Sequence, residues 1–280
     1  MRTSRTVAEL REHLRATRGT VGLVPTMGAL HAGHESLISA ARRESEHVVV
    51  SLFVNPAQFN DPRDLEAYPR DEATDAAIAE GLGADVLFAP PPDEVYRAGH
   101  STKVFVEGLG ERLEGAHRGP GHFAGVCTVV AKLFNMVRPD LAYFGQKDAQ
   151  QVAVLRRMVR DLDFPLEIRV CPTVRDADGL ALSSRNARLT LPQREKALGL
   201  STALRAAAED GIEAGEAVLE EYGIAPEYFA AVDPETFEPP GDLIVIAATI
   251  GGIRLIDNLA ATPDSRGADP KGAVSVLPTP

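Results

Sequence analysis

Short apolar runs alternate with longer amphipathic segments along the first 172 residues of the chain. The runs are continuous and rich in Val, Ile, Leu and Phe, which is typical of strands that are buried on both faces of a parallel sheet. They predict five strands, over 20–25, 47–54, 84–90, 141–145 and 166–172.

The segments between these runs repeat their apolar residues at intervals of three and four, which predicts helices. The predicted helices cover 6–17, 33–46, 71–82, 126–136 and 149–162. Strands that alternate with helices form βαβ units, and such units connect parallel strands. We therefore expect an α/β fold, a Rossmann-like doubly wound parallel sheet, in a domain that covers residues 1–173.

The character of the chain changes after residue 173. Two helical patterns are followed by three strand-like runs, over 191–211, 212–222, 226–232, 242–250 and 253–259. This order predicts a smaller α+β C-terminal domain over 174–260. The segment 261–280 is rich in Pro, Gly, Asp and Ser, which predicts a flexible tail, although its apolar stretch 273–277 could dock.

Composition and charge narrow the class of protein. The chain has 280 residues, of which 44% are apolar and 25% charged, and its net charge is -11. Acidity of this size argues against nucleic acid as the main partner. No apolar run approaches the roughly 18 residues that a membrane span needs. Residues 1–14 form an amphipathic pattern with acidic side chains rather than a signal peptide, so we expect a cytoplasmic protein without a membrane partner.

The two cysteines, Cys127 and Cys171, are far apart in the chain and lie in apolar contexts. We expect both to be buried thiols rather than a disulfide or a reactive nucleophile. No group of Cys and His has the spacing of a metal site, so no protein ligands of a metal are predicted.

The stretch VPTMGALHAGHES, which begins at Val24, joins the first predicted strand to a helix. Ligands of doubly wound sheets bind beyond the carboxyl ends of the strands, and the N–H groups of a helix N-terminus attract anions. His31 and His34 lie about one turn apart at that point, and Gly28 permits a tight backbone beside a ligand. This pattern suits the phosphate chain of a nucleotide. In the alternative interpretation, one histidine caps the helix and the other is solvated.

The histidine pattern resembles the first signature of the nucleotidyltransferase superfamily, adenylate-forming enzymes that include class I aminoacyl-tRNA synthetases. The second signature of that superfamily is a mobile basic loop near the end of the nucleotide domain, and ALSSRN (181–186) stands in the matching place. Ser183 and Ser184 offer hydroxyls there, and Arg185 offers a fork of donors to phosphate. Taken alone, the segment could also be a plain polar turn.

Five further stretches extend the resemblance to one family. They are FVNPAQF (53–59), DLEAYPR (64–70), GHFAGVCTVVAKLFNMVRPD (121–140), YFGQKDAQQ (143–151) and PTVRDADGLALSSRN (172–186). In this order they resemble the pantothenate synthetase (pantoate–β-alanine ligase) family, from about residue 6 to residue 258. The resemblance implies an enzyme that uses ATP and Mg²⁺ to join pantoate to β-alanine through pantoyl adenylate. It also implies a homodimer, for which an apolar strand over 103–107 is a candidate interface.

The resemblance implies roles for individual residues as well. The family's ATP-binding segment matches Met27, Gly28, Ala29, Leu30, His31, Ala32, Gly33 and His34. Further ATP contacts match Gly145, Gln146, Lys147, Asp148, Val174, Leu182, Ser183, Ser184 and Arg185. The substrate contacts match Gln58 and Gln151, with Asn55, Tyr68 and His122 as additional candidates. The expected catalytic residues are His34 as proton donor, together with His31, Lys147, Ser183 and Arg185.

The chain departs from the family pattern in two places. HRGPGHF carries one extra residue, most simply Gly119, which places Arg118 one position further from His122 and leaves its role at the β-alanine end open. Leu182 stands where methionine is usual, a mild apolar exchange.

Three other functions stay open on the residues alone. A tRNA-synthetase-like or nucleotidyl-transferring enzyme is disfavoured by the acidic chain and by the lack of an anticodon-type domain. A non-catalytic nucleotide-binding protein is disfavoured by the intact histidines, Lys147 and Arg185. A Rossmann dehydrogenase is disfavoured because no G-x-G-x-x-G follows the first predicted strand.

Overall fold

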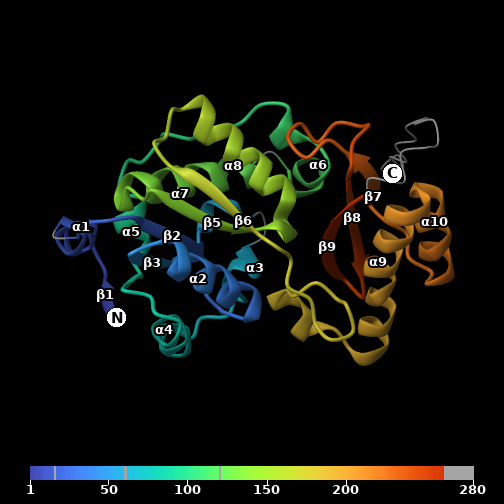
Figure 1. Ribbon diagram of the computed structural model, residues 1–280, viewed down its shortest axis with the longest axis horizontal. Helices are drawn as coiled ribbons and strands as arrows, with labels where there is room; N and C mark the ends of the chain where they lie inside the picture. Colours follow the sequence, from blue (N-terminus) through green and yellow to red (C-terminus); the bar gives the residue numbers. More distant parts are fainter. Residues whose placement is uncertain (16, 60–61, 120, 262–280) are drawn as a thin grey trace. The chain divides into compact units, whose positions relative to one another are not determined.

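The computed structural model describes residues 1–15, 17–59, 62–119 and 121–261. The chain divides into two compact units, which are coloured by sequence in Figure 1. One unit comprises 1–145 and 154–172, and the other comprises 146–153 together with the described residues from 173 onward.

The first unit is built on a six-stranded parallel sheet with the strand order β1-β4-β3-β2-β5-β6. Its strands are β1 (Arg2–Ser4), β2 (Val21–Thr26), β3 (His47–Leu52), β4 (Val86–Phe88), β5 (Leu141–Gly145) and β6 (Glu167–Cys171). The order reverses at β2, because the chain moves from β2 towards β3 on one side and β5 pairs with β2 on the other. The carboxyl end of β2 is therefore a switch point, where doubly wound sheets bind ligands.

Helices cover both faces of this sheet. They are α1 (Val7–Arg15), α2 (Ala32–Glu44), α3 (Pro62–Glu66), α4 (Glu72–Gly81), α5 (Pro92–Val95), α6 (Glu114–Arg118), α7 (Gly121–Val137) and α8 (Ala149–Asp161). In Figure 1, α2 and α4 lie on one face, and α7 and α8 lie on the other. Buried side chains of α2, β2, β3 and β4 form one core cluster, with Ile38, Val48 and Leu87 completely buried. Covering on both faces explains why the strands are continuously apolar.

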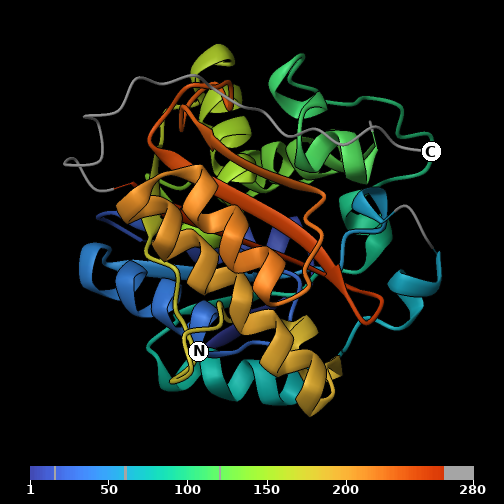
Figure 2. The same cartoon turned by 90° about the vertical axis from the view of Figure 1, so that its right-hand side faces the viewer.

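The second unit packs two helices on a three-stranded antiparallel sheet, as Figure 2 shows. The helices are α9 (Leu191–Asp210) and α10 (Ile212–Glu221), and the strands are β7 (Tyr228–Val232), β8 (Leu243–Ile250) and β9 (Ile253–Ala260). Its core includes Leu200, Leu204, Phe229 and Ile246. The α/β fold with a smaller α+β part is thus confirmed.

Most predicted elements are present, and the differences have physical causes. The helix predicted over 126–136 begins earlier, at Gly121. The prediction missed its first turn because Gly121 and Gly125 are poor helix formers and weaken the helical pattern there. The strand predicted over 103–107 is wrong: this segment forms no strand in the described structure, and the Val104 N–H donates to the Thr128 hydroxyl at 3.0 Å instead. Strand β1 was not predicted, because only three residues form it.

Both cysteines are free and buried, as predicted. Burial raises the pKa of the Cys127 thiol to about 12 and also raises the pKa of Cys171. No helix in the part of the chain that the structure describes is long and apolar enough to cross a membrane. Of the predicted tail, residues 262–280 lie outside the described residues.

Candidate active site

The loop after β2 is held in an uncommon backbone conformation. Gly28 has a φ of 88° and Ala29 a φ of 52°, both in the left-handed region. The loop is fixed by Asp75 of α4, whose Oδ2 accepts the Ala29 N–H at 3.0 Å and whose Oδ1 accepts the Leu30 N–H at 2.7 Å. Asp75 is only 3% exposed, so both of these charge-assisted bonds are shielded from water. This carboxylate therefore determines the path of the chain into α2.

His31 caps helix α2, as the alternative interpretation of the sequence proposed for one of the histidines. Its Nδ1 accepts the Gly33 N–H at 3.1 Å. A Cβ atom on Gly33 would lie 2.8 Å from His31 Cε1, so glycine allows the ring to fold back over the helix N-terminus. Because Nδ1 is an acceptor, the proton of the neutral ring resides on Nε2, which can donate to an oxyanion.

His34 lies one turn into α2 and is half-buried. The centroids of the His31 and His34 rings are 4.2 Å apart, with 42° between the ring planes. The two imidazoles thus form one unit at the helix N-terminus, as the sequence predicted.

Gln58 lies next to the same loop, because its Nε2 is 3.2 Å from the Met27 sulfur. Asn55, buried at the start of a 3₁₀ turn, orients it by donating from Nδ2 to Gln58 Oε1 at 2.9 Å. Asn55 Oδ1 in turn accepts the Tyr96 hydroxyl at 2.8 Å. Burial raises the pKa of Tyr96 to about 12, so this hydroxyl remains a donor. The sequence predicted Asn55 and Gln58 but gave no signal for Tyr96.

His122 and Tyr68 complete this group of residues. The Nδ1 atom of His122, which is buried in the first turn of α7, lies 3.1 Å from the Gln58 carbonyl oxygen. His122 thus supports the backbone of the Gln58 turn. The Tyr68 hydroxyl donates to the Gly28 carbonyl oxygen at 3.5 Å, and its ring packs edge-on against Phe59. Gln58 and Tyr68 therefore contact the loop of Met27 and Gly28, and Asn55 and His122 hold Gln58 in place.

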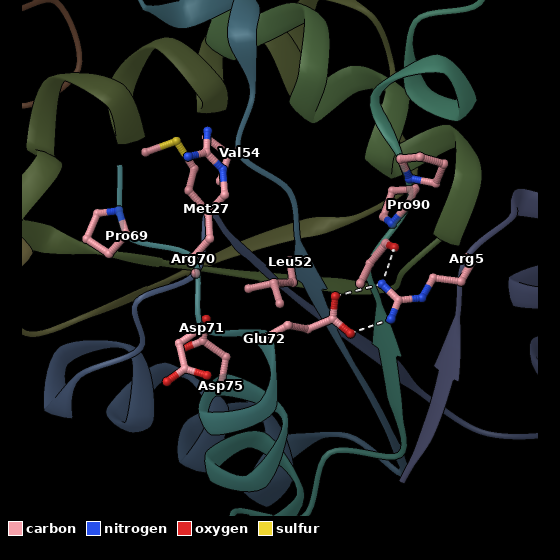
Figure 3. A pocket seen from close by; sticks show the side chains of 13 residues that line it. Arg5, Met27, Leu52, Val54, Pro69, Arg70, Asp71, Glu72, Asp75 and Pro90 are labelled. Carbon is pink, nitrogen blue, oxygen red and sulfur yellow. Dashed lines mark hydrogen bonds and ion pairs between the residues drawn. The ribbon is translucent and has the colours of Figure 1, made fainter. Parts of the chain in front are cut away.

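A cavity of about 390 Å³ adjoins this loop (Figure 3). Met27, Gly28 and Asp75 line it, but His31, His34 and Gln58 do not, so it reaches only the Met27 and Gly28 end of the predicted ATP-binding segment. Its far wall carries an ion pair in which Arg5 Nη1 donates to Glu72 Oε2 at 2.7 Å. Hydrogen bonding from Arg5 lowers the pKa of Glu72.

The other predicted ATP contacts are Gly145, the last residue of this stretch of the first unit, and residues of the second unit. Gly145 ends β5, and a 3₁₀ turn over Gln146–Asp148 leads directly into α8. Lys147 is mostly buried, and its Nζ lies 3.6 Å from Asp148 Oδ1. Gln151 follows in the first turn of α8 and is half-buried. The turn therefore keeps a single lysine beside a helix start, a suitable arrangement for a phosphate.

The predicted basic loop forms a compact local structure. The Val174 carbonyl accepts the Leu182 N–H at 3.0 Å, which brings two of the predicted contacts together. The Ser183 hydroxyl caps the following 3₁₀ turn (Ser184–Arg188) by accepting the Arg185 N–H at 3.2 Å. Asn186 Nδ2 then donates to the Ala181 carbonyl at 2.9 Å. The loop is therefore an organised turn with a half-buried arginine rather than an extended segment.

The arrangement defines a class of protein: a doubly wound nucleotide-binding enzyme of the adenylate-forming nucleotidyltransferase type. Paired imidazoles at a helix N-terminus can stabilise charge on a phosphate, and the adjacent amide can bind a polar substrate. In the described residues, no group of three or more His, Cys, Asp and Glu side chains is placed to hold a metal ion.

Comparison with known proteins agrees with this class and identifies one family within it. The family model described as pantoate–beta-alanine ligase matches residues 2–260. The pantothenate synthetase of Cereibacter sphaeroides is 51% identical over 274 residues, which cover 91% of this chain and 98% of that protein. The chain belongs to the pantoate–β-alanine ligase family.

Solved structures of this family are also similar to this chain. The pantothenate synthetase of Thermus thermophilus has a TM-score of 0.89 and 49% identity, and the match covers 94% of this chain and 100% of that one. The pantoate–beta-alanine ligase of Francisella tularensis, solved in complex with beta-gamma ATP and beta-alanine, has a TM-score of 0.82 and 36% identity. That match covers 93% of this chain and 98% of the other.

Proposed function

We propose that this chain joins pantoate to β-alanine in two steps that consume ATP. Pantoate carboxylate attacks the α-phosphorus of ATP, which forms pantoyl adenylate and releases pyrophosphate. The amine of β-alanine then attacks the acyl carbon, and AMP leaves. The observation that carries the proposal is the His31–His34 pair at the start of α2, with rings 4.2 Å apart, in a chain of this family.

In the first step, His34 and His31 stabilise the negative charge that develops on the phosphate oxygens. The Nε2–H of His31 is the donor that its cap leaves protonated, and His34 acts as proton or hydrogen-bond donor beside it. Helix α2 adds its own N-terminal N–H groups and dipole. Little covalent chemistry is required of the protein, because positioning and electrostatic stabilisation supply most of the rate.

Gln58 binds the pantoate hydroxyls and carboxylate and later the β-alanine, since a neutral amide both donates and accepts. Asn55 holds this amide in place, and Tyr68 and His122 support its surroundings. Gln151 supplies a second pantoate contact. These roles are supported by the hydrogen bonds that order Gln58 and by the family match.

Lys147 and Arg185 neutralise phosphate charge, and the hydroxyls of Ser183 and Ser184 add hydrogen bonds. Gly145, Gln146 and Asp148 provide the turn around Lys147, and the Val174 backbone contacts adenine. The local order of both turns supports these assignments, because an ordered donor costs less entropy on binding than a mobile one.

We propose that Mg²⁺ binds to the enzyme together with ATP. The described residues contain no built carboxylate cluster, which fits an ion held mainly by phosphate oxygens and water, as is usual for Mg²⁺. When bound, it would supply positive charge to the pyrophosphate that leaves. We also propose a cytoplasmic homodimer, and sedimentation of the purified chain would test its assembly.

The experiment is the formation of pyrophosphate and AMP from ATP and Mg²⁺, with pantoate alone and then with β-alanine added. Pyrophosphate with pantoate alone, and pantothenate with AMP only after β-alanine is added, would establish both steps. Adenylation without amide formation would confine the failure to the second step and point to the HRGPGHF segment. The absence of any pantoate-dependent turnover would refute the proposed function.

A further inference from the structure

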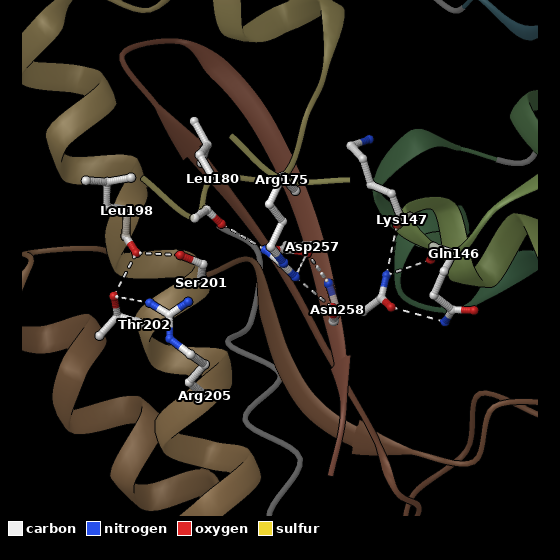
Figure 4. Close-up of polar contacts among 12 residues, drawn as sticks. Gln146, Lys147, Arg175, Leu180, Leu198, Ser201, Thr202, Arg205, Asp257 and Asn258 are labelled. Carbon is white, nitrogen blue, oxygen red and sulfur yellow. Dashed lines mark hydrogen bonds and ion pairs between the residues drawn. The ribbon is translucent and has the colours of Figure 1, made fainter. Parts of the chain in front are cut away.

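Strand β9 contains two adjacent polar residues in its second half, Asp257 and Asn258, which are each only 4% exposed. Burying a carboxylate or an amide is costly unless every polar atom finds a partner. The partners of these two residues therefore show what the pair is for. All of them lie in the second unit, and Figure 4 shows the arrangement.

The side chain of Asn258 binds the turn that carries Lys147. Its Nδ2 donates to the carbonyl oxygens of Gln146 and Lys147, each at 2.9 Å. Its Oδ1 accepts Gln146 Nε2 at 3.1 Å. Both amide hydrogens and the amide oxygen are thus used, and two consecutive peptide units of the turn are fixed to β9.

The side chain of Asp257 binds the segment that leads into the Ser183 loop. Its two oxygens accept Arg175 Nη1 at 2.6 Å and Nη2 at 2.9 Å, the geometry of a bidentate pair. The same guanidinium donates to the carbonyls of Gly179 at 3.1 Å and Asn258 at 3.3 Å. Arg175 also forms a β-bridge with Ala181, the residue before the predicted phosphate-binding positions.

We propose that Asp257 and Asn258 are positioning residues that fix two phosphate-binding segments, 146–148 and 182–185, to one strand. The proposal rests on the proposed function, because that function assigns phosphate contact to these segments. Neither Asp257 nor Asn258 touches the nucleotide in this proposal. They act by holding Lys147 and the Ser183 turn in a ready geometry, so that ATP binding does not have to order them.

Two variants separate the two arms of the pair. Asn258→Asp keeps the shape but replaces the amide donor with a carboxylate that faces two carbonyl oxygens. Arg175→Lys keeps the charge but removes the bidentate fork. The matched control is Glu227→Gln, which breaks a different ion pair to the same strand, from Arg254 Nε to Glu227 Oε2 at 2.5 Å.

The test is calorimetric titration with ATP and Mg²⁺ in the absence of pantoate, together with backbone hydrogen exchange. We expect ATP affinity to fall about 10- to 100-fold in both variants, a size typical of small displacements of positioned groups, and to stay unchanged in Glu227→Gln. The rate of backbone hydrogen exchange should rise first at residues 146–148 in Asn258→Asp. In Arg175→Lys it should rise first at residues 182–185.

Unchanged ATP affinity in both folded variants, with a lower melting temperature only, would overturn the proposal in favour of a purely structural role. If Asn258→Asp does not fold, Arg175→Lys decides alone by the same criteria. Because this titration needs no turnover, it stands apart from the pantoate-dependent assay. Wild-type protein that binds ATP but shows no turnover with pantoate would refute the ligase function and leave this test intact.

Discussion

Replacing Asp75 by Asn should disable the proposed ATP-binding loop without changing its surroundings. The carboxylate of Asp75 accepts two backbone N–H groups, from Ala29 and Leu30, at 3.0 and 2.7 Å. An asparagine side chain of the same shape offers only one oxygen, and its NH₂ group would face an N–H donor. One backbone N–H therefore loses its acceptor in a site that is 3% exposed.

The magnitude follows from the bonds that are lost. Hydrogen bonds to a charged group contribute about 1.5–3 kcal/mol each, and a buried unpaired donor costs about 1–3 kcal/mol. These two figures describe the same lost bond and are not added, and the left-handed backbone at Ala29, which itself costs ~1–2 kcal/mol, is then held less firmly. We expect Asp75→Asn to destabilise the loop by about 2–4 kcal/mol, which corresponds to a loss of up to about 30- to 1,000-fold in kcat/KM for ATP.

The assay is pyrophosphate release with pantoate, measured as a function of ATP concentration, alongside thermal unfolding. Asp71→Asn is the matched control, because it makes the same charge change on the same helix. Asp71 is exposed and caps α4 by accepting the Thr74 N–H at 3.1 Å, a role that Asn also fills well. Its kinetics should match those of wild type.

A result would refute this reasoning if Asp75→Asn kept its kcat/KM for ATP within about twofold of wild type while remaining folded. The loop geometry would then be set by its own sequence and not by α4. A similar loss in Asp71→Asn would also count against it, because the effect would then come from charge and not from the two hydrogen bonds.

Four further outcomes are expected. His34→Ala should slow adenylation by at least ~100-fold in a stopped assay of pyrophosphate release, with an unchanged melting temperature; a rate near that of wild type would remove its proposed role. Gln58→Ala should raise KM for pantoate and for β-alanine about tenfold, the effect of one lost hydrogen bond of ~1.4 kcal/mol, and unchanged values would place it outside the site. Gly125→Ala would put a Cβ atom 2.3 Å from the Ala57 carbonyl oxygen. Steady-state kinetics should therefore show a higher KM for pantoate, and the free energy of unfolding should fall by about 1–3 kcal/mol. Unchanged kinetics and stability would mean that the turn of Ala57 and Gln58 moves freely. Burial raises the pKa of Cys127 from 9.0 to about 12, so its contribution to stability is complete below about pH 9 and is lost as pH rises towards 12. Denaturant titrations should show that the free energy of unfolding falls less steeply with rising pH in Cys127→Ala than in wild type. An equally steep fall in both proteins would contradict the prediction.

The elements could be predicted where the apolar pattern is long and strictly periodic. Strands β2 and β3 and helices α8 and α9 fall within one or two residues of their predicted bounds. The apolar run at 103–107 misled the prediction, because its composition suits a strand but the segment pairs with no strand in the part of the chain that the structure describes. Strand pairing depends on the rest of the fold, and the local sequence does not contain it.

The residues of the candidate site could be predicted where they belong to a local sequence motif. His31, His34, Gln58 and Lys147 stand in recognisable stretches, and the structure groups the first three around one loop. Asp75 and Tyr96 could not be predicted, because each acts on residues about 40 positions away through a buried hydrogen bond. An aspartate in an amphipathic helix and a tyrosine before a loop carry no local signal of such roles.

The structure shows the helix cap that the alternative interpretation of the H-x-G-H stretch proposed, and this cap is compatible with the proposed role in phosphate binding. Capping by His31 was the alternative to a role in phosphate binding, yet the cap is what fixes the ring and places its proton on Nε2. Gly33 makes room for that ring, and the spacing of three brings His34 against it. An aspartate would cap the helix equally well, but its carboxylate would not leave a donor on the far side. We therefore propose that the histidine at the cap serves phosphate binding as well as helix stability.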